Sequence, residues 1–187
     1  MKEHHADAFW AEMSACEHFV QIYEADDVFM DTLTGFISGG FSPGHSAVVI
    51  GTPAHRDELD RRLMAMGFDI AGARERDQFI SLDAKETLSK FMVNGWPDDA
   101  RFKAVIADIL DRATQGGRKV RAFGEMVAVM WAEGQCAATV RLEHLWHQIC
   151  QDEPFALFCA YPKAGFTEDP VESIARVCAV HSRVLAI

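Results

Sequence analysis

The chain has 187 residues, of which 49% are hydrophobic and 25% are charged, and its formal net charge is −10. This length and composition predict one folded domain, residues 1–187, with a substantial core. The negative charge disfavours nucleic acid as a partner, because a phosphate backbone would be repelled. No apolar run reaches the ~20 residues that span a bilayer, and no signal peptide is recognisable, so we expect a cytoplasmic protein without a membrane partner.

Apolar runs that predict strands alternate along the chain with amphipathic segments that predict helices. In chain order these are a helical arm at 1–16, a strand at 18–23, a helix from Asp26 or Asp27 to about 40, a strand at 46–51, a helix from Pro53 to Gly67, a strand at 78–83, a helix around 87–91, a long helix from Asp98 or Asp99 to about 116, a strand at 119–125, a helical region at 126–150 interrupted near Gly134, a strand at 155–162 and a helix from Pro170 to about Val180. Strands separated by helices need crossovers, which predicts a three-layer α/β/α domain with a mostly parallel sheet.

The carboxyl ends of these strands are the place where open parallel sheets bind ligands. The residues at or next to those ends are Tyr23, Glu24, Thr52, Asp83, Glu125 and Tyr161. Three carboxylates brought together would raise one another's pKa and would suit a divalent metal, an amine or a hydroxyl-bearing ligand. The alternative is that each carboxylate only caps the helix that follows it. The sequence leaves both interpretations open.

Other signals of chemistry are weak. His144 and His147 are spaced so that two imidazoles can share a helix face, as metal ligands do, but no further ligand is dictated by spacing. The five cysteines form no Cys-x-x-Cys pair and are read as reduced packing residues: Cys16, Cys136, Cys150, Cys159 and Cys178. Neither Gly-x-Ser-x-Gly nor Gly-x-Gly-x-x-Gly is present. We therefore expect no catalytic residues, no metal and no cofactor.

Five stretches, "HFVQIYE", "GEMVAVMWAEG", "LEHLWHQI", "FALFCAYP" and "HSRV", resemble the MEDS family in order and spacing, over His18 to Val184. This is the sensory domain of methanogen and methylotroph signalling proteins, typified by the DcmR regulator. The resemblance implies a sensor of small molecules, alone or joined to kinase or DNA-binding modules, with a degenerate RecA/KaiC-like fold. The family positions that match here are His18, Tyr23, Glu24, Gly124, Glu125 and Tyr161.

A RecA/KaiC-like ATPase would carry a glycine-rich Gly-Lys-Thr/Ser loop after the first strand. Here that place holds "YEADDVFM" (23–30), without glycine or lysine, and the charge of Glu24 repels phosphate. The position of the catalytic glutamate pair holds Gly51, Thr52 and Pro53. The resemblance therefore implies the frame of such an ATPase without a functional P-loop.

These observations predict a stand-alone, non-catalytic sensory domain. It would bind an unidentified small molecule at the strand ends and signal through a partner in trans, such as a histidine kinase or other regulator, or as a homodimer. The expected ligand-binding residues are His18, Tyr23, Glu24, Thr52, Asp83, Glu125 and Tyr161. Two alternatives stay open: a nucleotide- or metal-dependent hydrolase that uses the acidic residues, and a pure protein-interaction domain.

Overall fold

The computed structural model describes residues 17–41 and 44–185, so the arm expected at 1–16 lies outside the described residues. The elements in order are β1 (His18–Tyr23), α2 (Asp26–Phe41), β2 (Ser46–Gly51), α3 (Pro53–Ala65), α4 (Ile70–Glu75), β3 (Phe79–Asp83), α5 (Ala84–Ser89), β4 (Met92–Val93), β5 (Trp96–Pro97), α6 (Asp99–Ala113), η1 (Gln115–Gly117), β6 (Val120–Gly124), α7 (Met126–Ala132), α8 (Cys136–Asp152), β7 (Phe155–Pro162), η2 (Lys163–Gly165), α9 (Pro170–Ala179) and β8 (Arg183–Leu185).

Six strands form one sheet in the order β3-β2-β6-β7-β1-β8, and every pair of neighbours is parallel. The predicted mostly parallel sheet is thus confirmed. All residues of β1, β2 and β6 are buried, as are all but the last of β7, because helices cover both faces of the sheet.

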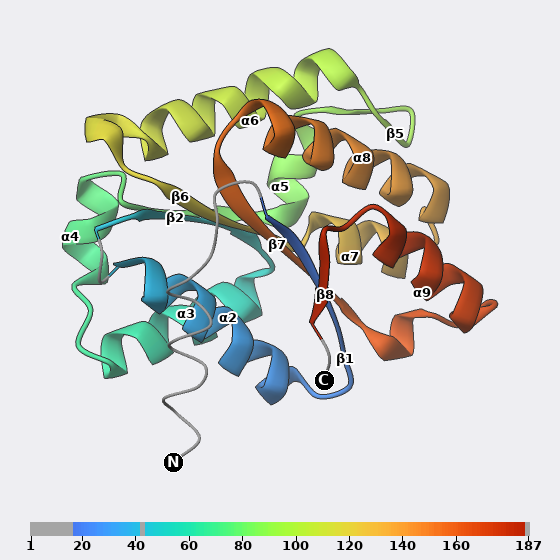
Figure 1. Cartoon of the computed structure of the whole chain (residues 1–187), viewed down its shortest axis with the longest axis horizontal. Helices are drawn as coiled ribbons and strands as arrows, with labels where there is room; N and C mark the ends of the chain where they lie inside the picture. The colour runs from blue at the N-terminus through green and yellow to red at the C-terminus, as the bar shows by residue number, and fades with distance from the viewer. Residues whose placement is uncertain (1–16, 42–43, 186–187) are drawn as a thin grey trace.

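Helices pack on the two faces as two separate layers (Figure 1). On one face α2, α3 and α4 cover an aromatic cluster that includes Phe29, Phe123 and Phe158. On the other face α5 to α9 cover a second cluster that includes Trp146 and Tyr161. The three-layer α/β/α architecture expected from the sequence is therefore confirmed. Alternate residues of each strand serve the two clusters, as in β1, where Phe19 lies in the first and Val20 in the second.

Several short elements were not predicted. A small antiparallel hairpin joins β4 to β5 through Asn94 and Gly95, whose positive φ angles of 51° and 76° suit a two-residue hairpin turn. Helix α4 is only six residues long, and its cap is Asp69, which accepts from the Gly72 amide. Strand β8 extends the sheet beyond β1. Among the described residues, no helix has both the length and the apolar character needed to cross a membrane.

Candidate functional site

Glu125 follows β6 and is buried beside the end of β2. One carboxylate oxygen accepts from the Thr52 amide at 2.7 Å, and the other contacts Nδ1 of His55 at 2.7 Å and the Thr52 hydroxyl at 3.3 Å. The Glu125 amide donates to the carbonyl of Ile50, which fixes the residue against β2. We call Thr52, His55 and Glu125 the Glu125 centre. Thr52 and Glu125 lie at the same edge of the sheet, as the sequence predicts, and the structure adds His55.

Protonation at the Glu125 centre follows from these contacts. The hydrogen bond to Glu125 raises the pKa of His55 above its ordinary value, against the effect of partial burial. Burial, and then the nearby Glu125 charge, raise the pKa of Tyr23, whose ring stacks on Phe29. The contacts with Thr52 and His55 therefore already satisfy the Glu125 carboxylate from within the fold.

The other two strand-end carboxylates lie elsewhere. Asp83 accepts from the Glu86 amide at 2.9 Å and caps α5, as the capping alternative expects. Glu24 is exposed and pairs with Lys163 at 2.5 Å, and this hydrogen bond lowers the pKa of Glu24. In the sheet β7 separates the strand of Glu24 from that of Glu125. The expectation that three acids share one site is wrong, because their strands are not adjacent.

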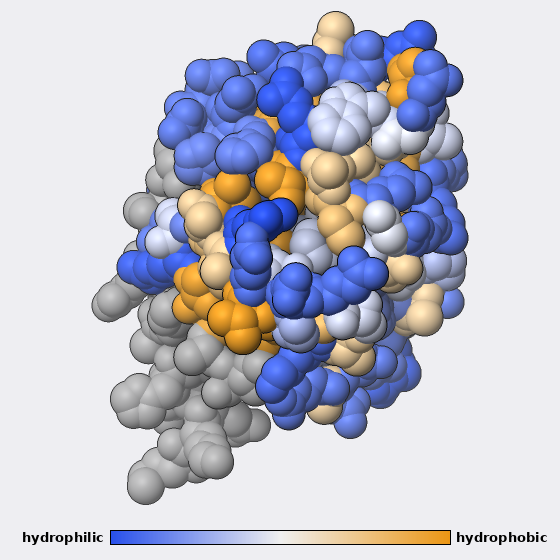
Figure 2. Space-filling model, turned by 90° about the vertical axis from the view of Figure 1, so that its right-hand side faces the viewer, coloured by the Kyte–Doolittle hydropathy of each residue, from blue (hydrophilic) through white to orange (hydrophobic). Residues whose placement is uncertain are grey.

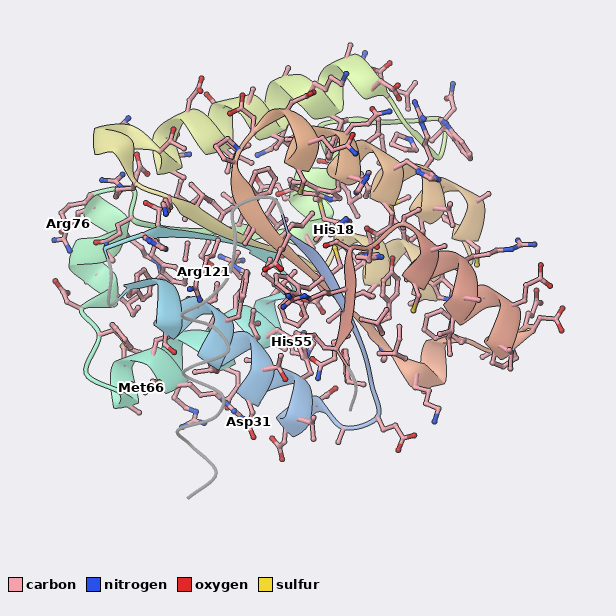
Figure 3. All side chains as sticks on the ribbon, in the orientation of Figure 1. His18, Asp31, His55, Met66, Arg76 and Arg121 are labelled. Atoms are coloured by element: carbon pink, nitrogen blue, oxygen red, sulfur yellow. The ribbon has the colours of Figure 1, made fainter. Side chains whose placement is uncertain are left out.

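A different group of side chains converges on the opposite face of the sheet. We call His18, Glu143, Cys159 and His181 the buried donor cluster; their ligating atoms all lie within 4.8 Å of one another. Oε2 of Glu143 lies 3.4 Å from Nε2 of His18, 3.4 Å from Nε2 of His181 and 3.6 Å from Sγ of Cys159. Nε2 of His18 is 3.4 Å from Sγ of Cys159. In Figure 3, His18 lies on one face of the sheet and His55 lies on the other.

Four segments distant in the chain position the buried donor cluster. His18 begins β1, Cys159 lies on β7 and Glu143 lies on α8; β1 and β7 pair with Val20 opposite Cys159. His181 follows α9 and is held by the pairing of β8 with β1. Tyr161 lies two residues beyond Cys159 on the same side of β7, and its hydroxyl donates to Oε1 of Glu143 at 2.5 Å.

Burial and the close contacts between these groups together shift the pKa values in this cluster. Burial lowers the pKa of His18, so the neutral imidazole is favoured there. Burial alone would raise the pKa of Glu143, but the neighbouring imidazoles of His181 and His18 outweigh it and hold that pKa well below its usual range. Burial raises the pKa of Cys159 and of Tyr161, and the Glu143 carboxylate adds to both effects. An ionised carboxylate therefore lies between a thiol, a phenol and two imidazoles.

The paired histidines of α8 do not act together. His144 is exposed, whereas the ring of His147 lies 6.1 Å from that of His18 and its Nε2 contacts Gln151 at 3.0 Å. Neither belongs to the metal-ligand group found among the described residues.

A groove of about 890 Å³ lies beyond the end of β7, between the α7–α8 corner, η2 and α9. Its apolar lining includes Trp131 and Val140, and its polar lining includes Glu172, Ser173 and Arg176. The indole Nε1 of Trp131 donates to the Gly165 carbonyl at 3.1 Å, which ties one wall to η2. Figure 2 looks onto the side of the molecule where α8 and α9 lie and shows apolar residues exposed among hydrophilic ones.

Residues 17–182 match the family model described as MEDS, the methanogen/methylotroph, DcmR sensory domain. The chain belongs to the MEDS family. No protein with a curated description matches it. Among solved structures, it is similar to the Pyrococcus horikoshii OT3 protein of structural study project PH0250, with a TM-score of 0.60 and 10% identity, over 96% of this chain and 86% of that one. At this identity the likeness shows a shared fold only.

In this MEDS domain the expected ligand-binding residues do not form one site. Tyr23, Thr52 and Glu125 lie at or beside the Glu125 centre, and His18 and Tyr161 belong to the buried donor cluster or contact it. The sequence interpretation missed three members of that cluster, Glu143, Cys159 and His181. The signal was present in the stretches "LEHLWHQI", "FALFCAYP" and "HSRV", but no regular spacing links them.

Proposed function

We propose that this MEDS domain is a non-catalytic sensory module that binds a small molecule in the groove between the α7–α8 corner and α9. Support comes from two facts: the family is a sensory one, and the groove opens beyond the carboxyl end of a central strand, β7. The single observation that carries the proposal is that apolar and polar side chains line this groove together. The Glu125 centre supports the role less well, because its carboxylate is engaged by Thr52 and His55.

The lining suggests the chemistry of the ligand. Trp131 and Val140 offer apolar surface, and the α9 wall offers a hydroxyl at Ser173 and an ion pair between Glu172 and Arg176 at 2.5 Å. Both charged side chains are well exposed, so they can rearrange toward a ligand at little cost. We expect a molecule with an apolar body and one hydrogen-bonding group.

The signal would pass through α9. Of its residues only Val177 is buried, so the helix is held by few core contacts and can shift on binding. Its N-terminal half lines the groove, and its exposed face includes Val171, which is 86% exposed. A shift of α9 would change the surface offered to a partner protein in trans, such as a kinase or regulator, or to a second copy.

The test is a small-molecule fragment screen read by amide chemical shifts of the ¹⁵N-labelled protein. Binding fragments should move the amides of Trp131, Gly165 and Ser173. Ala137 lines the groove on α8, so Ala137→Trp should fill it and abolish those shifts. Ala100 lines a separate hollow on α6, and the matched change Ala100→Trp should leave them intact. Fragments that bind equally to both variants would contradict the proposed site.

A further inference from the structure

We propose that the buried donor cluster binds one zinc ion through Nε2 of His18, Oε2 of Glu143, Sγ of Cys159 and Nε2 of His181. This inference goes beyond the proposed sensory function, because it stands whether or not the groove binds a ligand. It also differs from the sequence expectation of no metal, since the four donors come from segments that no spacing rule connects.

Four of the six distances between donors match those around a tetrahedral ion. Ligand atoms about 2.0–2.3 Å from a tetrahedral zinc ion lie roughly 3.3–3.8 Å from one another. The four separations measured in the cluster are 3.4, 3.4, 3.4 and 3.6 Å. Four of the six donor–donor distances of such a tetrahedron are therefore already present, and the other two, from His181 to His18 and to Cys159, are at most 4.8 Å.

The charges also balance. The side chains of His18, Glu143 and His181 are at most 1% exposed, and Cys159 is wholly buried. Within the part of the chain that the structure describes, the ion partners of Glu143 are the two histidines, with no lysine or arginine. One Zn²⁺, one carboxylate, one thiolate and two neutral imidazoles sum to zero, which is the charge a buried site favours. Binding forms the Zn–S bond as the thiol proton of Cys159 leaves to solvent.

Hydrogen bonds from surrounding groups orient the metal-ligand atoms toward the centre of the cluster. Nδ1 of His181 contacts the Val177 carbonyl at 2.7 Å, which it can meet only as a donor, so the lone pair of neutral His181 is on Nε2. That buried Nε2 has no hydrogen-bond partner among the described residues. Tyr161 occupies Oε1 of Glu143 and leaves Oε2 to the metal. Such outer contacts are the usual support of zinc ligands.

The donor types select the ion. Two imidazoles, a thiolate and a carboxylate in a tetrahedral arrangement suit Zn²⁺, whereas Mg²⁺ and Ca²⁺ prefer oxygen ligands. All four positions are taken by protein atoms, which is typical of a structural rather than a catalytic zinc site.

The experiment measures metal binding by the full chain, without a histidine tag. Every protein carries alanine at His4 and His5, because these adjacent imidazoles could bind metal on their own. Metal is removed with a chelator, Zn²⁺ is titrated back against a chromophoric competitor, and zinc content is measured by mass spectrometry. We expect about one equivalent of tightly held Zn²⁺ and at least a ~100-fold loss of affinity in Cys159→Ala and His181→Gln.

Two controls keep the test decisive. His147→Gln and Cys178→Ser change a neighbouring imidazole and a thiol outside the cluster, and both should bind zinc as the parent does. If the ligand variants fail to fold, Co²⁺ added to the parent still reports the site, because cysteine ligation gives a thiolate-to-cobalt charge-transfer band. Absence of stoichiometric Zn²⁺ binding, a Co²⁺ complex without that band, or equal affinity in folded Cys159→Ala would overturn the proposal.

Discussion

Two buried tyrosines on adjacent strands have different surroundings. The Tyr161 hydroxyl donates to the buried Glu143 carboxylate, whereas the Tyr23 hydroxyl makes no hydrogen bond within the described residues. Tyr161→Phe should lower the free energy of unfolding by about 1–3 kcal/mol, because Oε1 of Glu143 is left without its donor. Tyr23→Phe, the matched control, should change it by less than about 0.5 kcal/mol. Urea unfolding measures both, and equal losses would contradict the role given to Tyr161.

His55 makes stability depend on pH in a definite direction. Its pKa is raised in the folded state by the hydrogen bond to Glu125 and by the charges of Glu125 and Asp26. The stability gained is therefore fully present below the unfolded-state pKa of about 6.5 and is lost as pH rises through the folded-state pKa.

The wild-type protein should accordingly lose more stability than His55→Gln between pH 6 and pH 8, as measured by the urea midpoint at constant ionic strength. Comparing the two proteins removes the contribution of other titrating groups. A loss that is the same in both would show that His55 does not carry this pH dependence.

At the level of single residues the sequence predicted part of what the structure contains. Thr52 and Glu125 were placed together because parallel strands end at one edge, and the capping alternative for Asp83 rested on its position before α5. No comparable rule predicts from the sequence that His181 and Glu143 lie beside His18. Their proximity depends on α8 and α9 packing against β1, and a single sequence has no period that encodes such packing.

Strand β8 is attached to β1 by a reciprocal pair of side-chain hydrogen bonds. The Ser182 hydroxyl accepts from the His18 amide at 2.8 Å and donates to the His18 carbonyl at 2.9 Å. Ser182→Ala should cost about 1–3 kcal/mol, because the His18 amide loses its acceptor.

Hydrogen exchange should locate this effect. The amides of β8 and of the end of α9 should exchange faster in Ser182→Ala, while those of β2 and β3 stay protected. Ser89→Ala is the control, since Ser89 is exposed and its hydroxyl donates to the Glu86 carbonyl of its own helix. Unchanged protection of β8 would show that the Ser182 contact does not hold the strand.

The elements that the sequence predicted are those with strong patterns. Strands β1, β2, β6 and β7 are short, mostly apolar runs that are buried almost throughout, and a buried central strand favours such a run. Strand β8 has three residues, none of them buried, and exists because β1 offers an open edge. The β4–β5 hairpin depends on two residues per strand and on the Asn94–Gly95 turn, which is also typical of an ordinary loop.

The molecule as a whole presents an unfavourable surface to nucleotides. Its formal net charge is −10, and the turn from β1 to α2, where a phosphate loop would lie, carries Glu24 and then Asp26 and Asp27 in the first helical turn. Titration of the protein with ATP and Mg²⁺ in a calorimeter should give no saturable heat beyond that of Mg²⁺ alone. A saturable heat near one equivalent would revive the hydrolase alternative.

The order of the sheet has a consequence for the time course of folding. Of the strands in the described residues, β1 is made first, yet its two neighbours in the sheet are β7 and β8, the last two of these strands, and the His18–Ser182 contact spans 164 residues. Such long-range closure is slow, so β1 has no strand partner until β7 and β8 have been made. The β2–β3–β6 half can assemble first, and β1 stays accessible to chaperones until β7 and β8 are available to pair with it.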